Sequence, residues 1–158
     1  MAADQAWVLL SYRLPREPST PRSQVWRNLR RLGVVQIADG LVALPADPRT
    51  REALEWVAEE VVDHGGEAML WLGQPAEASG RDILQARMTD AVATEYQALI
   101  DEARATPLDD PVTLRRLVQR LRREMQRIEA RDYFPTPQRD EARRTIDALA
   151  ATRLQSTR

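Results

Sequence analysis

The segment VVQIADGLVALP, residues 34–45, constrains the fold of this chain most strongly. Its Asp39-Gly40 pair stands between two short apolar runs, which is the strongest local signal for a β-hairpin. We expect a type I′ turn there, because that turn requires positive φ at both central residues. Helical patterns flank the hairpin, and apolar β-prone runs at 6–14 and 67–73 lie beyond them. This order predicts an α+β fold, a ferredoxin-like βαββαβ sandwich.

Local signals bound the two helices of this unit. Thr20 and Pro21 are typical of the N-cap and first turn of a helix that ends at Gly33, where a left-handed residue is expected. A second helix begins after Asp47 and ends before the glycine pair that starts at Gly65. Both predicted helices carry an apolar stripe that can cover one face of the sheet.

Beyond residue 75 the pattern is wholly helical. Three helices are predicted, over 80–104, 112–131 and 138–154. The sequence therefore predicts a ferredoxin-like domain over 1–75 and a three-helix C-terminal extension over 76–158 that packs on it.

Missing residue types exclude several kinds of chemistry. The 158 residues include no cysteine and one histidine, so disulfides, thiol catalysis and cysteine-ligated metals are excluded. No nucleophile–base set or glycine-rich phosphate loop is evident, so we expect no enzyme activity, metal or cofactor. No apolar run approaches the length of a membrane span, and no leader pattern opens the chain. We therefore expect a cytoplasmic protein without membrane contact.

Charge is segregated along the chain although the net charge is only −1. Residues 1–45 carry six arginines against three acids, 46–110 five against fifteen, and 111–158 twelve against six. All 23 basic residues are arginine, which fits either a biased genome composition or selection for bidentate oxyanion recognition. An acidic middle between basic ends could support self-association, or the basic ends could share one surface.

The loop before the first helix is a candidate oxyanion-binding site. Free N–H groups at a helix N-terminus and planar arginine donors favour a tetrahedral anion. The alternative is a solvated loop whose arginines pair with the acidic middle segment. The candidate residues are Arg13, Arg16, Thr20 and Arg22.

Two helices present arginines that could contact nucleic acid through its phosphates. The alternative is a solvated face, or one paired with acids such as Asp101, Glu102 and Glu124. A pI near 5.9 and the lack of a helix-turn-helix pattern count against base-specific recognition of DNA. The candidates are Arg27, Arg30 and Arg31 in the first helix and Arg116, Arg120, Arg123 and Arg127, spaced as one stripe, in the fourth.

Tyr133 and Phe134 follow this arginine-rich helix. Because Pro135 and Pro137 prevent further helix, we expect the aromatic pair to pack at the corner of a helical hairpin rather than to stack on bases.

Several ordered motifs together resemble the N-terminal domain of the chromate-resistance protein ChrB family. They are the helix end Val25, Trp26, Arg27, Leu29, Leu32 and Gly33, the hairpin Asp39, Gly40, Leu44 and Pro45, the stretch 65–68, the Glu95-Tyr96 pair, and Asp132 to Pro135. The resemblance covers nearly the whole chain.

The resemblance implies a regulatory or sensory role in chromate resistance, through transcription regulation of a chromate efflux operon. It implies a homodimer with DNA and chromate or another oxyanion as partners. Longer family members carry a second, C-terminal domain, which we expect this chain to lack. The alternative is therefore a protein–protein interaction module that acts with a separate second-domain partner and does not bind nucleic acid.

A more distant likeness, to phenylacetate-type repressors and small CRISPR-adaptation nucleases, rests on the same strand, helix and hairpin layout. Those nucleases place a metal-binding Asp at the end of the first strand, where this chain has Ser11, Tyr12 and Arg13. The likeness therefore does not support metal-dependent nuclease chemistry.

Overall fold

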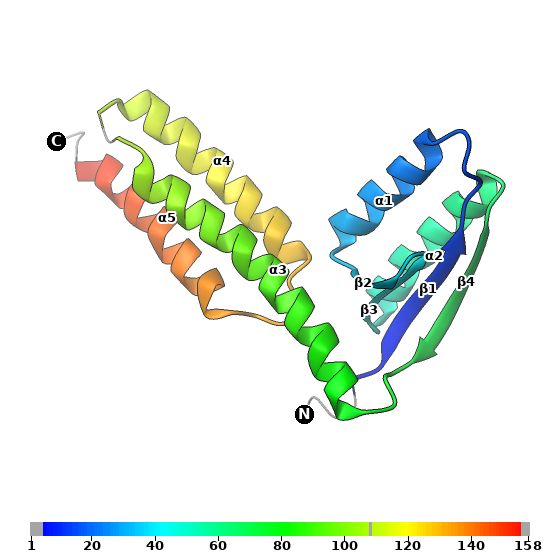
Figure 1. The fold of residues 1–158 in the computed structure, drawn as a ribbon. Helices are drawn as coiled ribbons and strands as arrows, with labels where there is room; N and C mark the ends of the chain where they lie inside the picture. Colours follow the sequence, from blue (N-terminus) through cyan, green and yellow to red (C-terminus); the bar gives the residue numbers. More distant parts are fainter. Residues whose placement is uncertain (1–4, 108, 156–158) are drawn as a thin grey trace. The chain divides into compact units, whose positions relative to one another are not determined.

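The computed structural model describes residues 5–107 and 109–155 (Figure 1). The chain forms two compact units, which divide inside one long helix between Met88 and Thr89. The elements are β1 (Trp7–Arg13), α1 (Thr20–Leu32), β2 (Val35–Ala38), β3 (Leu41–Pro45), α2 (Pro48–Asp63), β4 (Glu67–Gly73), α3 (Ala78–Ala105), α4 (Pro111–Ala130) and α5 (Pro137–Gln155).

The first unit has the predicted ferredoxin-like topology. Its four strands form an antiparallel sheet in the order β2-β3-β1-β4, and α1 and α2 cover one face (Figure 1). Val8 and Leu10 of β1 point toward these helices and are fully buried, together with Leu29 of α1 and Leu54 of α2. The alternation of β1 thus separates a helix-covered face from an opposite, open face.

The β2–β3 hairpin forms where it was predicted, but its turn is not type I′. Within the turn Gly40 has a positive φ of 73°, but Asp39 does not, since no non-glycine residue in the described part of the chain has one, so Asp39 cannot hold the first position of that turn. The register shifts between Gln36 and Ala38, which accommodates the altered turn geometry. Gly40 is also required sterically, since a Cβ there would lie 2.5 Å from the carbonyl oxygen of Tyr12.

The helices of the first unit begin differently. Asp47 accepts from the Thr50 backbone N–H at 2.7 Å and Thr50 Oγ1 accepts from the Asp47 N–H at 3.0 Å, a reciprocal capping box for α2. The N-cap of α1 is Ser19, one residue before the predicted Thr20, and its side chain makes no capping bond. The backbone N–H groups of the first turn of α1 therefore have no side-chain acceptor from the cap.

The second unit buries its own core between the part of α3 after Met88, α4 and α5. Tyr96, Ile100, Leu121, Ile128 and Ala142 are among its most buried members. The aromatic pair at 133–134 is half-buried in the turn between α4 and α5. The predicted boundary after residue 75 follows the end of the strand pattern, whereas the compact units divide further along, within α3. No helix in the part of the chain that the structure describes is long and apolar enough to cross a membrane.

Candidate anion-binding site beside α1

A pocket of about 910 Å³ opens beside the start of α1 in the first unit. It brings together three of the four residues that the sequence predicts for an oxyanion site, Arg13, Arg16 and Arg22. Thr20, the fourth, is exposed in the first turn of α1 and does not line this pocket. The remaining lining residues are Tyr12, Leu14, Ser19, Ser23, Trp26, Gln36, Asp39 and Gly40.

The sheet fixes one wall of this pocket. The Tyr12 N–H donates to the Gly40 carbonyl at 2.8 Å, which holds the hairpin turn against the end of β1. Because the turn lies beside Tyr12, Asp39 and Gln36 reach the same pocket as the loop arginines. Segments that are 20 or more residues apart in sequence therefore converge on one site.

The pocket arginines carry charge that no acid neutralises directly. Ion pairs between arginines and acids concentrate in the second unit, for example Arg104 with Glu141, whereas Arg51 pairs with Glu55 in the first. Arg13, Arg16 and Arg22 form none within the described chain, and Asp39 is the one acid that lines the pocket. The alternative, that these arginines pair with acids of the middle segment, has no supporting ion pair among the described residues.

Burial and the charges in the pocket change the pKa of Tyr12. Burial raises the pKa of the Tyr12 phenol above its ordinary value, the positive charge of Arg22 lowers it, and Asp39 raises it again. Tyr12 is therefore a neutral hydroxyl at physiological pH, beside a guanidinium and a carboxylate that both act on it.

This arrangement suits a tetrahedral oxyanion. Three guanidinium groups offer planar N–H donors, and Ser19 and Ser23 add hydroxyl donors on the first turns of α1. The uncapped N-terminus of α1 contributes the partial positive charge of its backbone. A pocket of this volume leaves room for a hydrated anion rather than a bare one.

The α1 arginines predicted to contact nucleic acid lie outside this pocket. Arg27, Arg30 and Arg31 are exposed and form no ion pair with any described acid. Arg31 lines a neighbouring groove with Glu60 of α2, but Glu60 instead accepts from the Asn28 amide at 2.9 Å. The α1 arginines therefore remain available to an external anion.

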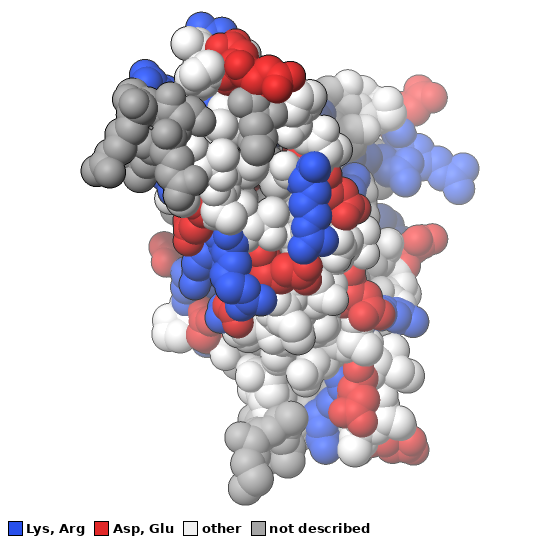
Figure 2. All heavy atoms as spheres, turned by 90° about the vertical axis from the view of Figure 1, so that its left-hand side faces the viewer, with Lys and Arg blue, Asp and Glu red and all other residues white. Residues whose placement is uncertain are grey.

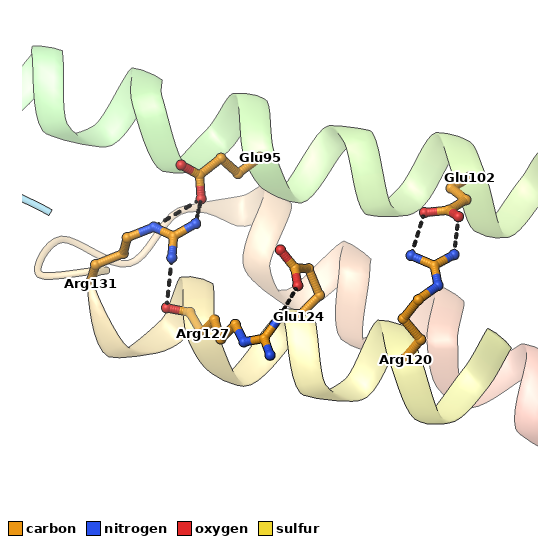
Figure 3. Close-up of polar contacts among 6 residues, drawn as sticks. All are labelled: Glu95, Glu102, Arg120, Glu124, Arg127 and Arg131. Atoms are coloured by element: carbon orange, nitrogen blue, oxygen red, sulfur yellow. Dashed lines mark hydrogen bonds and ion pairs between the residues drawn. The ribbon is translucent and has the colours of Figure 1, made fainter. Parts of the chain in front are cut away.

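The arginine stripe of α4 is largely occupied. Arg120 forms a bidentate ion pair with Glu102 of α3, and Arg127 donates to Glu124 at 2.9 Å (Figure 3). Arg116 and Arg123 have no ion pair among the described residues, although both line one shallow depression with Arg120. The structure thus splits the predicted stripe into two paired and two unpaired arginines.

Acids and arginines alternate elsewhere on the helical unit. On the face seen in Figure 2, blue and red side chains intermingle without forming one continuous basic surface. Ion pairs between helices explain this pattern, for example Arg104 with Glu141 and Arg143 with Glu129. A phosphate backbone would have to compete with these acids on this face.

Tyr12, Trp26 and Asp39 line the pocket but were not predicted from the sequence as part of the oxyanion site. For Tyr12 and Asp39 the signal lies in the strand pairing, because Asp39 and Gly40 form the turn that faces the end of β1, whereas Trp26 lies on α1. No cluster of three or more histidine or acidic side chains in the described residues is placed to hold a metal ion.

Comparison with known proteins assigns the chain to a family. Residues 22–106 match the family described as "Protein ChrB, N-terminal". The chain is also 31% identical, over 136 residues, to "Protein ChrB" of Cupriavidus metallidurans strain CH34. The match covers 84% of this chain and 41% of that protein, so the chain spans about two fifths of the relative's length. No solved structure matches it significantly. The residues that build the pocket and α1 therefore sit in a chain that belongs to the ChrB N-terminal family.

Proposed function

We propose that this chain is a regulatory or sensory module of chromate resistance that binds a tetrahedral oxyanion in the arginine pocket beside α1. One observation carries the proposal: Arg13, Arg16 and Arg22 converge on one pocket without an acidic partner within the described residues. Unpaired guanidinium groups that share a concave site favour an anionic ligand. Membership of the ChrB family supports chromate as that ligand and regulation as the role.

Isothermal titration calorimetry with chromate and with sulfate tests this proposal. Arg13→Gln and Arg22→Gln should each weaken binding about tenfold or more, because a hydrogen bond to a charged group contributes about 1.5–3 kcal/mol. Arg30→Gln is the matched control, since Arg30 is exposed on α1 but does not line the pocket. The proposal is wrong if chromate and sulfate both fail to bind, or if Arg30→Gln weakens binding as much as Arg22→Gln.

Nucleic-acid binding is a second candidate function, and the exposed, unpaired Arg27, Arg30 and Arg31 favour it. In that function α1, rather than α4, would contact phosphates, and bound oxyanion would compete with the phosphate backbone for neighbouring positive charge. The alternative of a protein–protein interaction module rests on the same free charge and predicts an acidic protein partner instead.

A further inference from the structure

Strand β4 is an exposed edge of the sheet. It pairs with β1 along its whole length, from Trp7 opposite Gly73 to Arg13 opposite Glu67, and no other described strand pairs with its outer side. Its residues range from half-buried to exposed, and Leu72 is 63% exposed. An edge strand of this kind presents unpaired backbone N–H and C=O groups to any strand that approaches it.

The side chains around this edge are unusually apolar for a surface. Eight large hydrophobic side chains are exposed among the described residues. Five of them belong to the first unit and lie around this edge. Met69, Trp71 and Leu72 are on β4, Ile37 is on β2, and Ile83 is near the start of α3. Such a concentration marks an interaction surface rather than scattered exposure.

Trp71 is positioned for contact. Its indole N–H donates to Ser11 Oγ at 2.9 Å, which fixes the ring on the open face of the sheet. The side chain is nevertheless 52% exposed, so its ring can be buried by a partner without losing that hydrogen bond. Fixed, half-exposed aromatic side chains are typical anchors of protein interfaces.

The strand carries none of the devices that normally prevent edge pairing. It has no proline and no basic residue, its register with β1 shows no bulge, and its single charge is Glu67 at one end. Natural edge strands are usually interrupted by charges, prolines or bulges in their centre. β4 is therefore open to pairing along its middle five residues.

We infer that β4 pairs antiparallel with β4 of a second copy of this chain, centred on Leu70. Full overlap of the seven-residue strand places Met69 opposite the partner's Trp71 on the open face. On the helix-covered face Ala68 lies opposite Leu72, and Leu70 meets Leu70 across the two-fold axis. The result is one continuous sheet of eight strands.

Charge favours a second copy over a charged partner. In this register each Glu67 lies opposite the other copy's Gly73, and the two Glu67 carboxylates are about 20 Å apart, beyond the screening length at physiological salt. No like charges face each other, and each apolar side chain of the strand lies opposite an apolar side chain of the other copy. The groove beside the strand has one charged lining residue, Arg87, and its guanidinium lies 3.5 Å from the Gln36 carbonyl oxygen.

Light scattering of the full chain at low and high salt tests whether two copies associate through β4 or through their charged segments. Pairing through β4 should give a dimer whose mass does not fall as salt rises, because apolar contacts and backbone hydrogen bonds are not screened. Association through the segregated acidic and basic segments should instead weaken with salt. A monomer at all micromolar concentrations, or a dimer lost in high salt, would overturn the inference.

Two equally exposed residues provide a matched pair of variants. Met69→Lys places a charge at the centre of the edge and should raise the dimer dissociation constant about tenfold or more. Val62→Lys on α2 changes a side chain of the same 55% exposure away from the edge and should leave the dimer unchanged. Equal effects of the two substitutions would show that β4 is not the interface.

Disulfide cross-linking can identify which residues of the two β4 strands face each other, because the chain has no cysteine of its own. Leu70→Cys should form a disulfide-linked dimer, because directly opposed residues of antiparallel strands have Cα separations of about 4.5–5.5 Å, within disulfide range. Met69→Cys and Trp71→Cys should cross-link to each other when mixed and far less when each is alone. Failure of Leu70→Cys to cross-link, or equal cross-linking by Val62→Cys, would refute the proposed pairing.

Discussion

At the scale of single residues, a buried polar network holds the turn between α4 and α5. The Tyr96 hydroxyl, on a fully buried side chain of α3, donates to Asp132 Oδ2 at 2.8 Å. Beside it Arg131 donates to Glu95 at 3.0 Å, as Figure 3 shows. Both bonds join α3 to the segment that ends α4, so the Glu95-Tyr96 pair and Asp132 noted in the sequence act as two halves of one contact.

Tyr96→Phe should destabilise the helical unit by about 1–3 kcal/mol at pH 7, because the half-buried Asp132 carboxylate loses its donor. Urea denaturation measures this difference. Tyr12→Phe is the control, since the Tyr12 hydroxyl makes no hydrogen bond within the described residues, and its cost should stay within about 0.5 kcal/mol. Comparable costs for both substitutions would contradict this role of Tyr96.

The same pair predicts a dependence on alkaline pH. Burial first, and then the hydrogen bond and charge of Asp132, raise the pKa of Tyr96 well above its ordinary value of 10.0. A raised folded-state pKa means that stability is fully present below pH 10 and falls as the unfolded tyrosine ionises above it. The advantage of the wild type over Tyr96→Phe should therefore stay constant up to about pH 10 and shrink progressively above it.

At the scale of elements, α1 and α4 carry similar arginine patterns but differ in their neighbours. Glu102 of α3 lies within reach of Arg120, so the α4 stripe is partly neutralised inside its own bundle. Glu60 of α2, which lines a groove with Arg31, accepts a hydrogen bond from Asn28 instead. Periodicity places arginines on the exposed face of each helix, but it cannot show which of them meets an acid from another helix.

This difference between helices sets a test of nucleic-acid binding. Replacing Arg27, Arg30 and Arg31 by glutamine should reduce the slope of log affinity against log salt by up to about 2.7, which is about 0.9 for each lost phosphate contact. Fluorescence anisotropy with a short duplex between 50 and 200 mM salt measures that slope. The matched triple change of Arg116, Arg120 and Arg123 should alter it less. A larger effect from the α4 triple would assign binding to α4.

At the scale of the whole molecule, the sequence predicts the fold better than the sites. Prolines, glycines and the Asp39-Gly40 pair are local signals, and they place every strand and helix within a few residues. Arg13 at the end of β1, Arg16 in the following loop and Arg22 in the first turn of α1 are close in sequence, which was enough to predict that they would lie near one another. The predicted topology places β4 at an edge of the sheet, but its exposure was not predicted, because the apolar run of 67–73 is also typical of a buried strand.

The two compact units predict two separate unfolding events. Leu44 of β3 and Leu121 of α4 are both fully buried, but each belongs to the core of a different unit. Leu44→Ala and Leu121→Ala should each cost about 2–5 kcal/mol, because each leaves a cavity in a closed core. In units of this size that cost lowers a melting midpoint by about 10 °C or more. Differential scanning calorimetry should therefore show two transitions, one lowered by Leu44→Ala alone and the other by Leu121→Ala alone. A single transition that both variants lower equally would mean that the chain unfolds as one cooperative body.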